Sequence, residues 1–188
     1  MQTMKNPLII MALEEEANGQ FNGHNVVYTG IGKVNAAYAL MKGIHDHKPD
    51  HIINLGSAGS TVFPAETLVN CTGFVQRDMD VTPLGVPQWQ TPFEAEEIIL
   101  KYGTVVEGMP QGICGTGDNF DTSGDHTTYN LVDMESYALA KVCRTEGLPF
   151  TCIKFISDGA DGKAHEDWRE SLEVGAQLMS AWLKELSA

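Results

Sequence analysis

The sequence predicts an α/β fold in which helices pack on a central sheet. Short apolar runs rich in strand-forming residues recur along the 188 residues, and segments with apolar residues at helical spacing lie between them. Alternation of this kind is typical of layered α/β domains. The length and a hydrophobic fraction of 43% suit one domain with its own core, so we expect a single domain over residues 1–188.

The first third of the chain shows the alternation most clearly. Residues 8–13 and 26–29 are continuous apolar runs that predict buried strands. A Gly-Ile-Gly turn then precedes a helix expected over 33–47, whose apolar residues recur at helical spacing. Residues 51–55 predict another buried strand, and the glycine-containing segment 56–59 predicts the turn that ends it.

The middle of the chain is less regular. Strands are expected over 67–72, 104–106 and 112–114, and a short helix near 94–102. Residues 78–94 contain three prolines and predict a long connecting loop.

The last third is clearer again. Residues 118–128 are polar and contain glycine, which predicts a loop. A helix is expected over 132–146, ended by Gly-Leu-Pro at 147–149. An apolar strand over 150–156 follows, and an amphipathic helix over 168–186 completes the chain.

Composition narrows the possible partners. The chain has 25 acidic and 12 Lys or Arg residues, a net charge of −13. Nucleic acids and anionic membranes attract basic surfaces, so neither is an expected partner. No stretch reaches the length needed to span a bilayer. The four cysteines form no CxxC pair, which favours free thiols in a reducing cytoplasm.

Familiar cofactor and metal motifs are missing from the sequence. The turn Gly30-Ile31-Gly32-Lys33 lacks the spacing of a Walker A loop, and Asn35 replaces the third glycine of a dinucleotide fingerprint. The six histidines form no recognisable ligand set. We therefore expect neither a cofactor nor a metal.

Three acidic groups follow expected strands or open an expected helix. They lie at 14–16, 133–135 and 157–161. Taken singly, each has a structural explanation: solvated surface for the first, helix capping for the others. Ligands of α/β sheets gather at the carboxyl ends of strands, which is where 13–16, 56–59 and 157–161 are expected. Together the carboxylates suit chemistry on a bond to a sugar.

Seven segments carry a further signal: 11–16 (MALEEE), 30–37 (GIGKVNAA), 48–59, 78–85 (DMDVTPLG), 117–120 (GDNF), 132–135 (VDME) and 155–161 (FISDGAD). In this order they resemble the motifs of the methylthioadenosine/S-adenosylhomocysteine nucleosidases, within the purine nucleoside phosphorylase family. The resemblance implies a three-layer, Rossmann-like nucleoside phosphorylase fold with a central mixed sheet. It also implies a homodimer and a small purine nucleoside as substrate.

The resemblance implies roles for individual residues. Glu16 matches the general base that activates water, and Asp158 matches the acid that protonates the purine at N7. Glu135 matches the carboxylate that binds the ribose hydroxyls. The other expected substrate-binding residues lie around the sugar, the water and the base: Ile31, Ser57, Gly59, Phe120, Asp121, Met134 and Ser157.

One position departs from the family. Lys154 stands where nucleosidases often have arginine. The lysine keeps the positive charge but lacks the forked set of donors of a guanidinium. The leading prediction is hydrolysis of an adenine nucleoside with release of adenine. Two alternatives stay open: a phosphorylase or a hydrolase of another purine nucleoside, and a catalytically weak nucleoside-binding protein.

Overall fold

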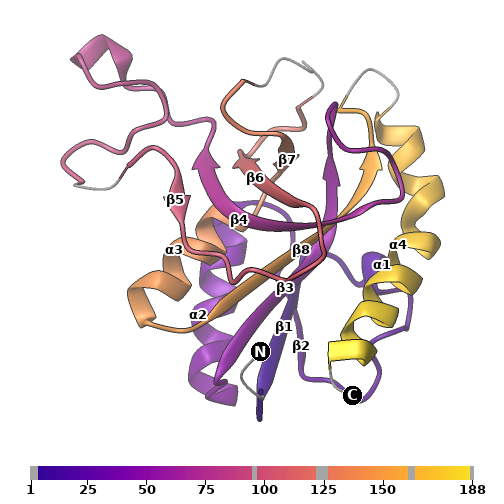
Figure 1. Ribbon diagram of the computed structural model, residues 1–188. Coiled ribbons are helices and arrows are strands. Elements are labelled where there is room, and N and C mark those ends of the chain that lie inside the picture. Colours follow the sequence, from indigo (N-terminus) through magenta and orange to yellow (C-terminus); the bar gives the residue numbers. More distant parts are fainter. Residues whose placement is uncertain (1–3, 95–96, 122–126, 161–163, 187–188) are drawn as a thin grey trace.

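A computed structural model describes residues 4–94, 97–121, 127–160 and 164–186. These residues form one mixed sheet of eight strands, flanked by helices (Figure 1). The strands are β1 Pro7–Met11, β2 Val26–Tyr28, β3 His51–Gly59, β4 Leu68–Gln76, β5 Leu100–Lys101, β6 Gln111–Thr116, β7 Leu131–Asp133 and β8 Phe150–Asp158. The helices are α1 Glu14–Ala17, α2 Lys33–His47, α3 Ser136–Glu146 and α4 Ala164–Leu186, with a 3₁₀ turn at Thr82–Leu84.

The sheet combines parallel and antiparallel pairs. β2, β1, β3 and β8 run parallel to their neighbours in this order, and β4, β6 and β7 do the same. Antiparallel pairs of β8 with β4 and of β7 with β3 join the two groups. The pairings close a ring, β3–β8–β4–β6–β7–β3, so the sheet curls on itself.

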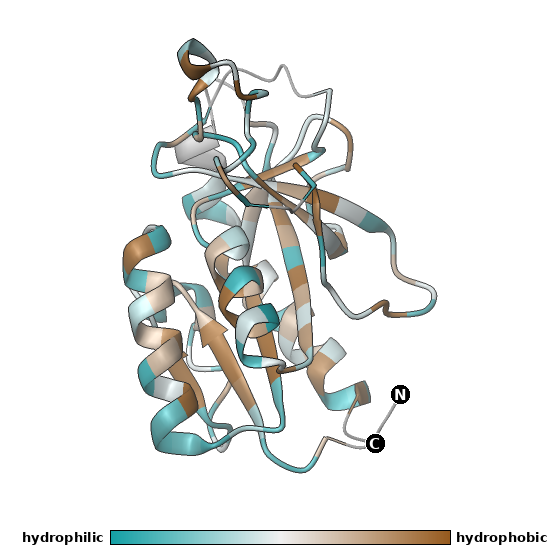
Figure 2. Cartoon of the chain, turned by 90° about the vertical axis from the view of Figure 1, so that its left-hand side faces the viewer, coloured by the Kyte–Doolittle hydropathy of each residue, from teal (hydrophilic) through white to brown (hydrophobic). Residues whose placement is uncertain are grey.

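Two helix layers cover the sheet. α2 and α3 lie on one side, where Leu40 and Leu139 join the core made with β3 and β8 (Figure 1). α1 and α4 lie on the other side, where Met179 and Leu183 pack on Ile153 and other strand residues. Figure 2 shows brown strands behind helices whose outer turns mix teal with white and brown. The predicted α/β fold with a central mixed sheet is confirmed.

The predicted end of β3 is wrong. Residues 56–59 continue the strand because β8 pairs with β3 from Ile52 opposite Phe150 to Gly59 opposite Asp158. A Cβ on Gly59 would lie 2.6 Å from Asp158 Oδ1. Glycine at this point therefore allows β3 to pass close to the Asp158 carboxylate.

The helix predicted over 132–146 begins later. Residues 131–133 form β7, which pairs with β6 and touches β3, and α3 starts at Ser136. The Asp133 carboxylate accepts a hydrogen bond from the Ser136 backbone N–H at 2.9 Å. Asp133 thus ends the strand and accepts the first backbone N–H of the helix, whose N-cap residue is Glu135.

Two predictions in the middle of the chain are also wrong. No helix forms over the described part of 94–102, where residues 95–96 lie outside the description. Instead β5 pairs antiparallel with β4. Residues 104–106 form no strand, because their backbone pairs with the Asn70 side chain. The Asn70 amide donates to the Thr104 carbonyl at 3.1 Å and accepts from the Val106 N–H at 2.9 Å. A buried amide here replaces the strand ladder.

Other boundaries shift by a few residues. The helix over 33–47 is confirmed, and the last helix begins at Ala164 rather than at 168. Residues 78–94 are irregular apart from the 3₁₀ turn, as expected. Of the loop expected over 118–128, residues 122–126 lie outside the description. Among the described helices, none combines the length and hydropathy needed to cross a membrane.

Candidate active site

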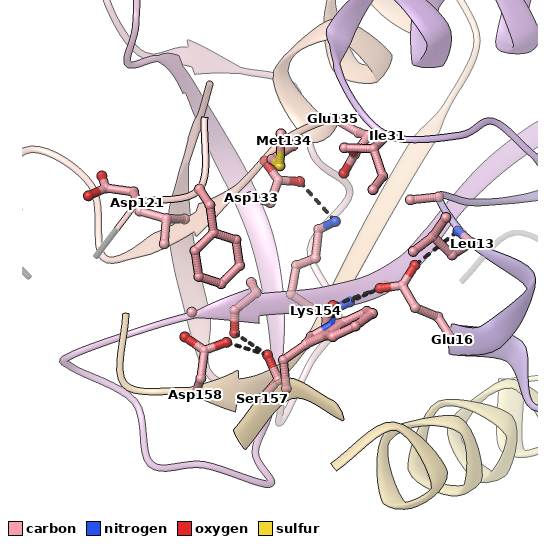
Figure 3. A pocket seen from close by; sticks show the side chains of 18 of the residues that line it. Leu13, Glu16, Ile31, Asp121, Asp133, Met134, Glu135, Lys154, Ser157 and Asp158 are labelled. Carbon is pink, nitrogen blue, oxygen red and sulfur yellow. Dashed lines mark hydrogen bonds and ion pairs between the residues drawn. The ribbon is translucent and has the colours of Figure 1, made fainter. Parts of the chain in front are cut away.

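One pocket of about 300 Å³ opens where β3, β7 and β8 end (Figure 3). All ten residues expected to act on the substrate line it: Glu16, Ile31, Ser57, Gly59, Phe120, Asp121, Met134, Glu135, Ser157 and Asp158. They come from six separate segments of the chain. The pocket therefore brings together residues that sequence motifs alone could not place relative to one another.

Glu16 is held at the wall of the pocket by hydrogen-bond donors. Its side chain lies in the short helix α1, and the residue is 5% exposed. Oε1 accepts hydrogen bonds from the Ser57 backbone N–H at 2.9 Å and the Ser57 hydroxyl at 2.7 Å. Oε2 accepts one from the Leu13 N–H at 3.2 Å. Donors from β3 and from the turn before α1 thus fix the direction of this carboxylate.

A second carboxylate, Asp158, ends β8. Figure 3 shows it with Ser157 on the other side of the pocket from Glu16. Its Oδ2 accepts the Ser157 hydroxyl at 2.7 Å, and its Oδ1 accepts the Ala160 N–H at 2.8 Å. Asp158 is 6% exposed, so the carboxyl is largely withdrawn from water. The pocket separates two buried acids with different hydrogen-bond partners.

The third carboxylate, Glu135, follows β7. Its Oε1 accepts a hydrogen bond from the Gly32 N–H at 2.8 Å, which joins it to the turn before α2. Burial and the neighbouring Asp133 raise the pKa of Glu135 to about 7, although Lys154 and the Gly32 N–H oppose the shift. Glu135 therefore changes charge near neutral pH.

Beneath these acids lies a buried ion pair. Lys154 Nζ on β8 lies 2.9 Å from Asp133 Oδ2 on β7. Burial would raise the pKa of Asp133, but Lys154 with the hydroxyls of Ser136 and Thr116 lowers it to about 2. Burial would likewise lower the pKa of Lys154, but Asp133 above all holds it well above the ordinary value. Both groups are charged at neutral pH.

Arg77 organises the segment that carries Phe120 and Asp121. Its guanidinium donates to the Gly115 carbonyl at 3.2 Å and to the Asn119 side chain at 2.8 Å. It also donates to the carbonyls of residues 117 and 119 and lies 3.6 Å from Asp121 Oδ2. Figure 3 shows the Asp121 carboxylate directed away from the other labelled side chains. The backbone of this segment, rather than the Asp121 carboxylate, is thereby presented to the pocket.

Known proteins resemble this chain in sequence and in fold. Residues 15–188 match the family described as the phosphorylase superfamily. The chain belongs to this superfamily. It is 34% identical to the 5′-methylthioadenosine/S-adenosylhomocysteine nucleosidase of Actinobacillus succinogenes, over 85% of this chain and 79% of that protein. The nucleosidase of the same name from Haemophilus influenzae strain PittEE is also 34% identical, over 89% of this chain and 83% of its own.

Solved structures show the same fold. The Helicobacter pylori nucleosidase bound to butyl-thio-DADMe-Immucillin-A has a TM-score of 0.86 at 24% identity, covering 98% of both chains. A futalosine hydrolase mutant from the same species also has a TM-score of 0.86 at 24% identity, over 97% of this chain and 98% of that one. The superfamily match and these relatives identify an enzyme of the purine nucleoside N-glycosidase and phosphorylase superfamily, and the predicted nucleoside phosphorylase fold is confirmed.

Several residues of the superfamily pocket were missed by the motifs. Asn54 lines it from inside the matched segment 48–59 but had no predicted role, and Arg77 precedes the 78–85 motif by one residue. Trp168 was expected on the apolar stripe of the last helix, but its indole faces the pocket and binds Ser57. Tryptophan carries a polar N–H that often finds a partner when buried, which was the only available signal.

Within the described ranges, no group of three His, Cys, Asp or Glu side chains is arranged to hold a metal ion.

Proposed function

We propose that the protein hydrolyses the N-glycosidic bond of an adenine nucleoside, 5′-methylthioadenosine or S-adenosylhomocysteine, and releases adenine. The names of the relatives above support this substrate class. The observation that carries the reaction type is the setting of Glu16. A buried carboxylate with three donors on its two oxygens is suited to accept a proton from a water molecule directed at the sugar.

The proposed reaction transfers two protons, one to the leaving purine and one from the attacking water. Asp158 donates a proton to purine N7, so that the base leaves C1′ as a neutral molecule. The C1′–N9 electron pair goes to the purine, and positive charge develops on the sugar. Glu16 then takes a proton from water as the water oxygen bonds to C1′. Carboxylates around the sugar stabilise the charge where it forms.

Substrate binding is assigned to the remaining residues. Glu135 binds the ribose hydroxyls, and Met134 packs against the sugar. Phe120 stacks on the base while the backbone at Asp121 contacts its edge. Phe120 is 55% exposed, which leaves an aromatic face accessible to a planar ligand. Ile31, Ser57, Gly59 and Ser157 complete the walls around the sugar and the water.

The charges favour water over phosphate as nucleophile. An anion between Glu16 and Glu135 would meet carboxylate oxygens, and the described cations of the pocket are already engaged. Lys154 is paired with Asp133, and Arg77 donates to backbone carbonyls. A phosphorylase needs a free cationic site for its anion. The same arrangement of three acids argues against a protein that only binds nucleosides.

One panel tests the proposal. Methylthioadenosine, S-adenosylhomocysteine, adenosine, inosine and futalosine are each incubated with and without phosphate, and free base and free sugar are measured. We expect adenine and a free sugar from one of the first two, at a rate that phosphate leaves unchanged. A sugar 1-phosphate as the main product would establish a phosphorylase. Preferential cleavage of inosine or futalosine would replace adenine by another purine, and binding without cleavage would remove the catalytic assignment.

We further propose that the enzyme is a homodimer of the cytoplasm. Helix α2 buries Ala36, Leu40 and Gly43 against the sheet, while Val34 and Tyr38 on its opposite face are 79% and 73% exposed. Met41 continues this apolar face at helical spacing. An exposed apolar helix face of this kind suits burial against a second copy. The four cysteines are free and buried, which suits a reducing compartment.

The oligomeric state is measured by light scattering or sedimentation at micromolar concentration. We expect a dimer, and we expect Tyr38→Glu to yield monomers because it places a charge on the apolar face. Lys184→Glu, at an exposed charged position of α4 on the other side of the sheet, is the matched control. A wild-type monomer with full activity would overturn the proposal.

A further inference from the structure

A hydrogen-bond chain reaches Glu16 from the last helix. Trp168 lies near the start of α4 and lines the pocket. Its indole Nε1–H donates to Ser57 Oγ at 2.8 Å. Ser57 Oγ in turn lies 2.7 Å from Glu16 Oε1. Three side chains from α4, β3 and α1 are thus connected in one line.

The chemistry of the three groups gives this chain one direction. The indole nitrogen can only donate a hydrogen bond, so Ser57 Oγ must accept from Trp168. A hydroxyl has a single proton, and the ionised carboxylate of Glu16 can only accept. The Ser57 proton therefore points to Glu16 Oε1. Trp168 occupies an acceptor site of the hydroxyl and so favours the rotamer that serves Glu16.

The two oxygens of Glu16 are not equivalent. Oε1 accepts both the hydroxyl and the backbone N–H of Ser57, which fills its two lone pairs. Oε2 accepts one hydrogen bond from a described residue, the Leu13 N–H at 3.2 Å. A lone pair of Oε2 is left for a water molecule in the pocket.

We propose that Trp168 is a positioning residue that fixes Ser57 as a donor to Glu16 Oε1, so that Oε2 is the oxygen that takes the proton from the attacking water. The inference rests on the proposed hydrolytic function. The proton moves from water to Oε2 while the water oxygen bonds to C1′, and the C1′–N9 electron pair leaves with the purine. Trp168 exchanges no proton in this step.

Trp168→Phe tests the inference because it keeps an aromatic ring and removes the Nε1–H. A single hydrogen bond of this kind contributes a net ~0.5–1.5 kcal/mol, so we expect kcat to fall about 2- to 13-fold. Adenine has no sugar and its binding does not use the attacking water. The Kd of adenine should therefore change less than about twofold, because the lost hydrogen bond acts on Ser57 and Glu16 and not on the base. Trp182→Phe is the matched control: Trp182 lies on the same helix in the core beneath it and should leave kcat unchanged.

A double-mutant cycle distinguishes positioning from general damage. In a Ser57→Ala background the indole has no hydroxyl to orient, so adding Trp168→Phe should leave kcat unchanged. Equal kcat for wild type and Trp168→Phe would overturn the inference, and so would losses that multiply in the double variant. These outcomes leave the proposed function standing, because the wild type still releases base. A wild type that releases no base from any nucleoside in the panel would overturn the proposed function and this inference together.

Discussion

Lys154 Nζ lies 2.9 Å from Asp133 Oδ2, and each side chain is only 2% exposed. The pair joins β8 to β7 at the wall of the pocket, which both residues line, and the Asp133 carboxylate also accepts the hydroxyls of Thr116 and Ser136. Removing one of these partners is costly, because the carboxylate then stays buried while its charge is no longer fully compensated. The pair therefore connects the stability of the fold to the shape of the site.

The first prediction concerns this ion pair. Lys154→Met leaves the Asp133 carboxylate buried without its cation, so we expect a loss of about 3–5 kcal/mol in the free energy of unfolding. Denaturant unfolding followed by circular dichroism measures it. Adding Asp133→Asn to Lys154→Met removes the orphaned charge and should restore part of the loss. A single variant as stable as wild type would show that the pair contributes nothing to folding.

The second prediction follows from Glu135. Its pKa of about 7 means that the ionised carboxylate, which we propose binds the ribose hydroxyls, becomes the main form only above that pH. We expect kcat/KM to rise as pH increases through 7, with a limb that is absent in Glu135→Gln. Rate measurements between pH 5.5 and 8.5 at fixed ionic strength provide the check, since this range extends about one and a half units on each side of the pKa. A limb that persists in Glu135→Gln would assign it to another group.

The same group has an effect on stability with a defined sign. The folded-state pKa of Glu135 is raised above the ordinary 4.5 to about 7, so its protonated form favours the fold. Its contribution is fully present below 4.5 and is lost as pH rises through 7, up to about 3 kcal/mol. Thermal unfolding should therefore show Glu135→Gln gaining stability relative to wild type between pH 5 and 8, a range that extends about two units below and one unit above the shifted pKa. A difference independent of pH would contradict the shift.

The third prediction concerns Arg77. Arg77→Lys keeps the charge but cannot serve the carbonyls at residues 115, 117 and 119 together. Because these contacts hold the segment of Phe120, we expect KM for the nucleoside to rise about tenfold, roughly 1.4 kcal/mol, with a smaller change in kcat. Steady-state kinetics measures the split. Arg144→Lys, at an exposed position of α3, is the control and should have the KM of wild type. If Arg77→Lys had the same KM as this control, Arg77 would not position the segment of Phe120.

Sequence patterns predicted both ends of α2 and the C-terminal end of α3. The apolar spacing of α2 and the Gly-Leu-Pro stop after α3 are local signals, so the end of each helix could be located. Short elements lack such signals. β7 has three residues and exists because β6 and β3 pair with it, and α1 is a single turn. The Thr104 segment follows a side chain, Asn70, rather than a strand.

The candidate site was predicted through ordered motifs, which name residues without giving their directions. The motifs gathered Glu16, Ser57 and Asp158, and the structure directs all three into one pocket. They could not give the partner of Ser57, because Trp168 lies 111 residues away and belongs to an ordinary amphipathic pattern. Contacts between distant segments depend on packing, and a single sequence does not record them.

The last prediction tests the proposed general acid. Asp158→Asn removes the transferable proton and nearly preserves shape. Its Oδ1 can still accept the Ala160 N–H, a bond of 2.8 Å in the wild type, and its amide can donate to Ser157 Oγ. General acid catalysis contributes on the order of 10²–10⁴-fold in rate, so we expect kcat to fall by at least about 100-fold while substrate binding weakens modestly.

A purely structural role for Asp158 gives a different outcome. If the carboxylate only orders the turn through Ala160, asparagine supplies the same acceptor and kcat should stay near that of wild type. A variant that retains more than about a tenth of wild-type kcat, against the ~10²-fold loss expected for a missing acid, would therefore refute the assignment. Glu16→Gln is the companion variant. It should also stop hydrolysis while adenine still binds, because the proposed task of Glu16 is to activate water, whereas that of Asp158 is to protonate the base.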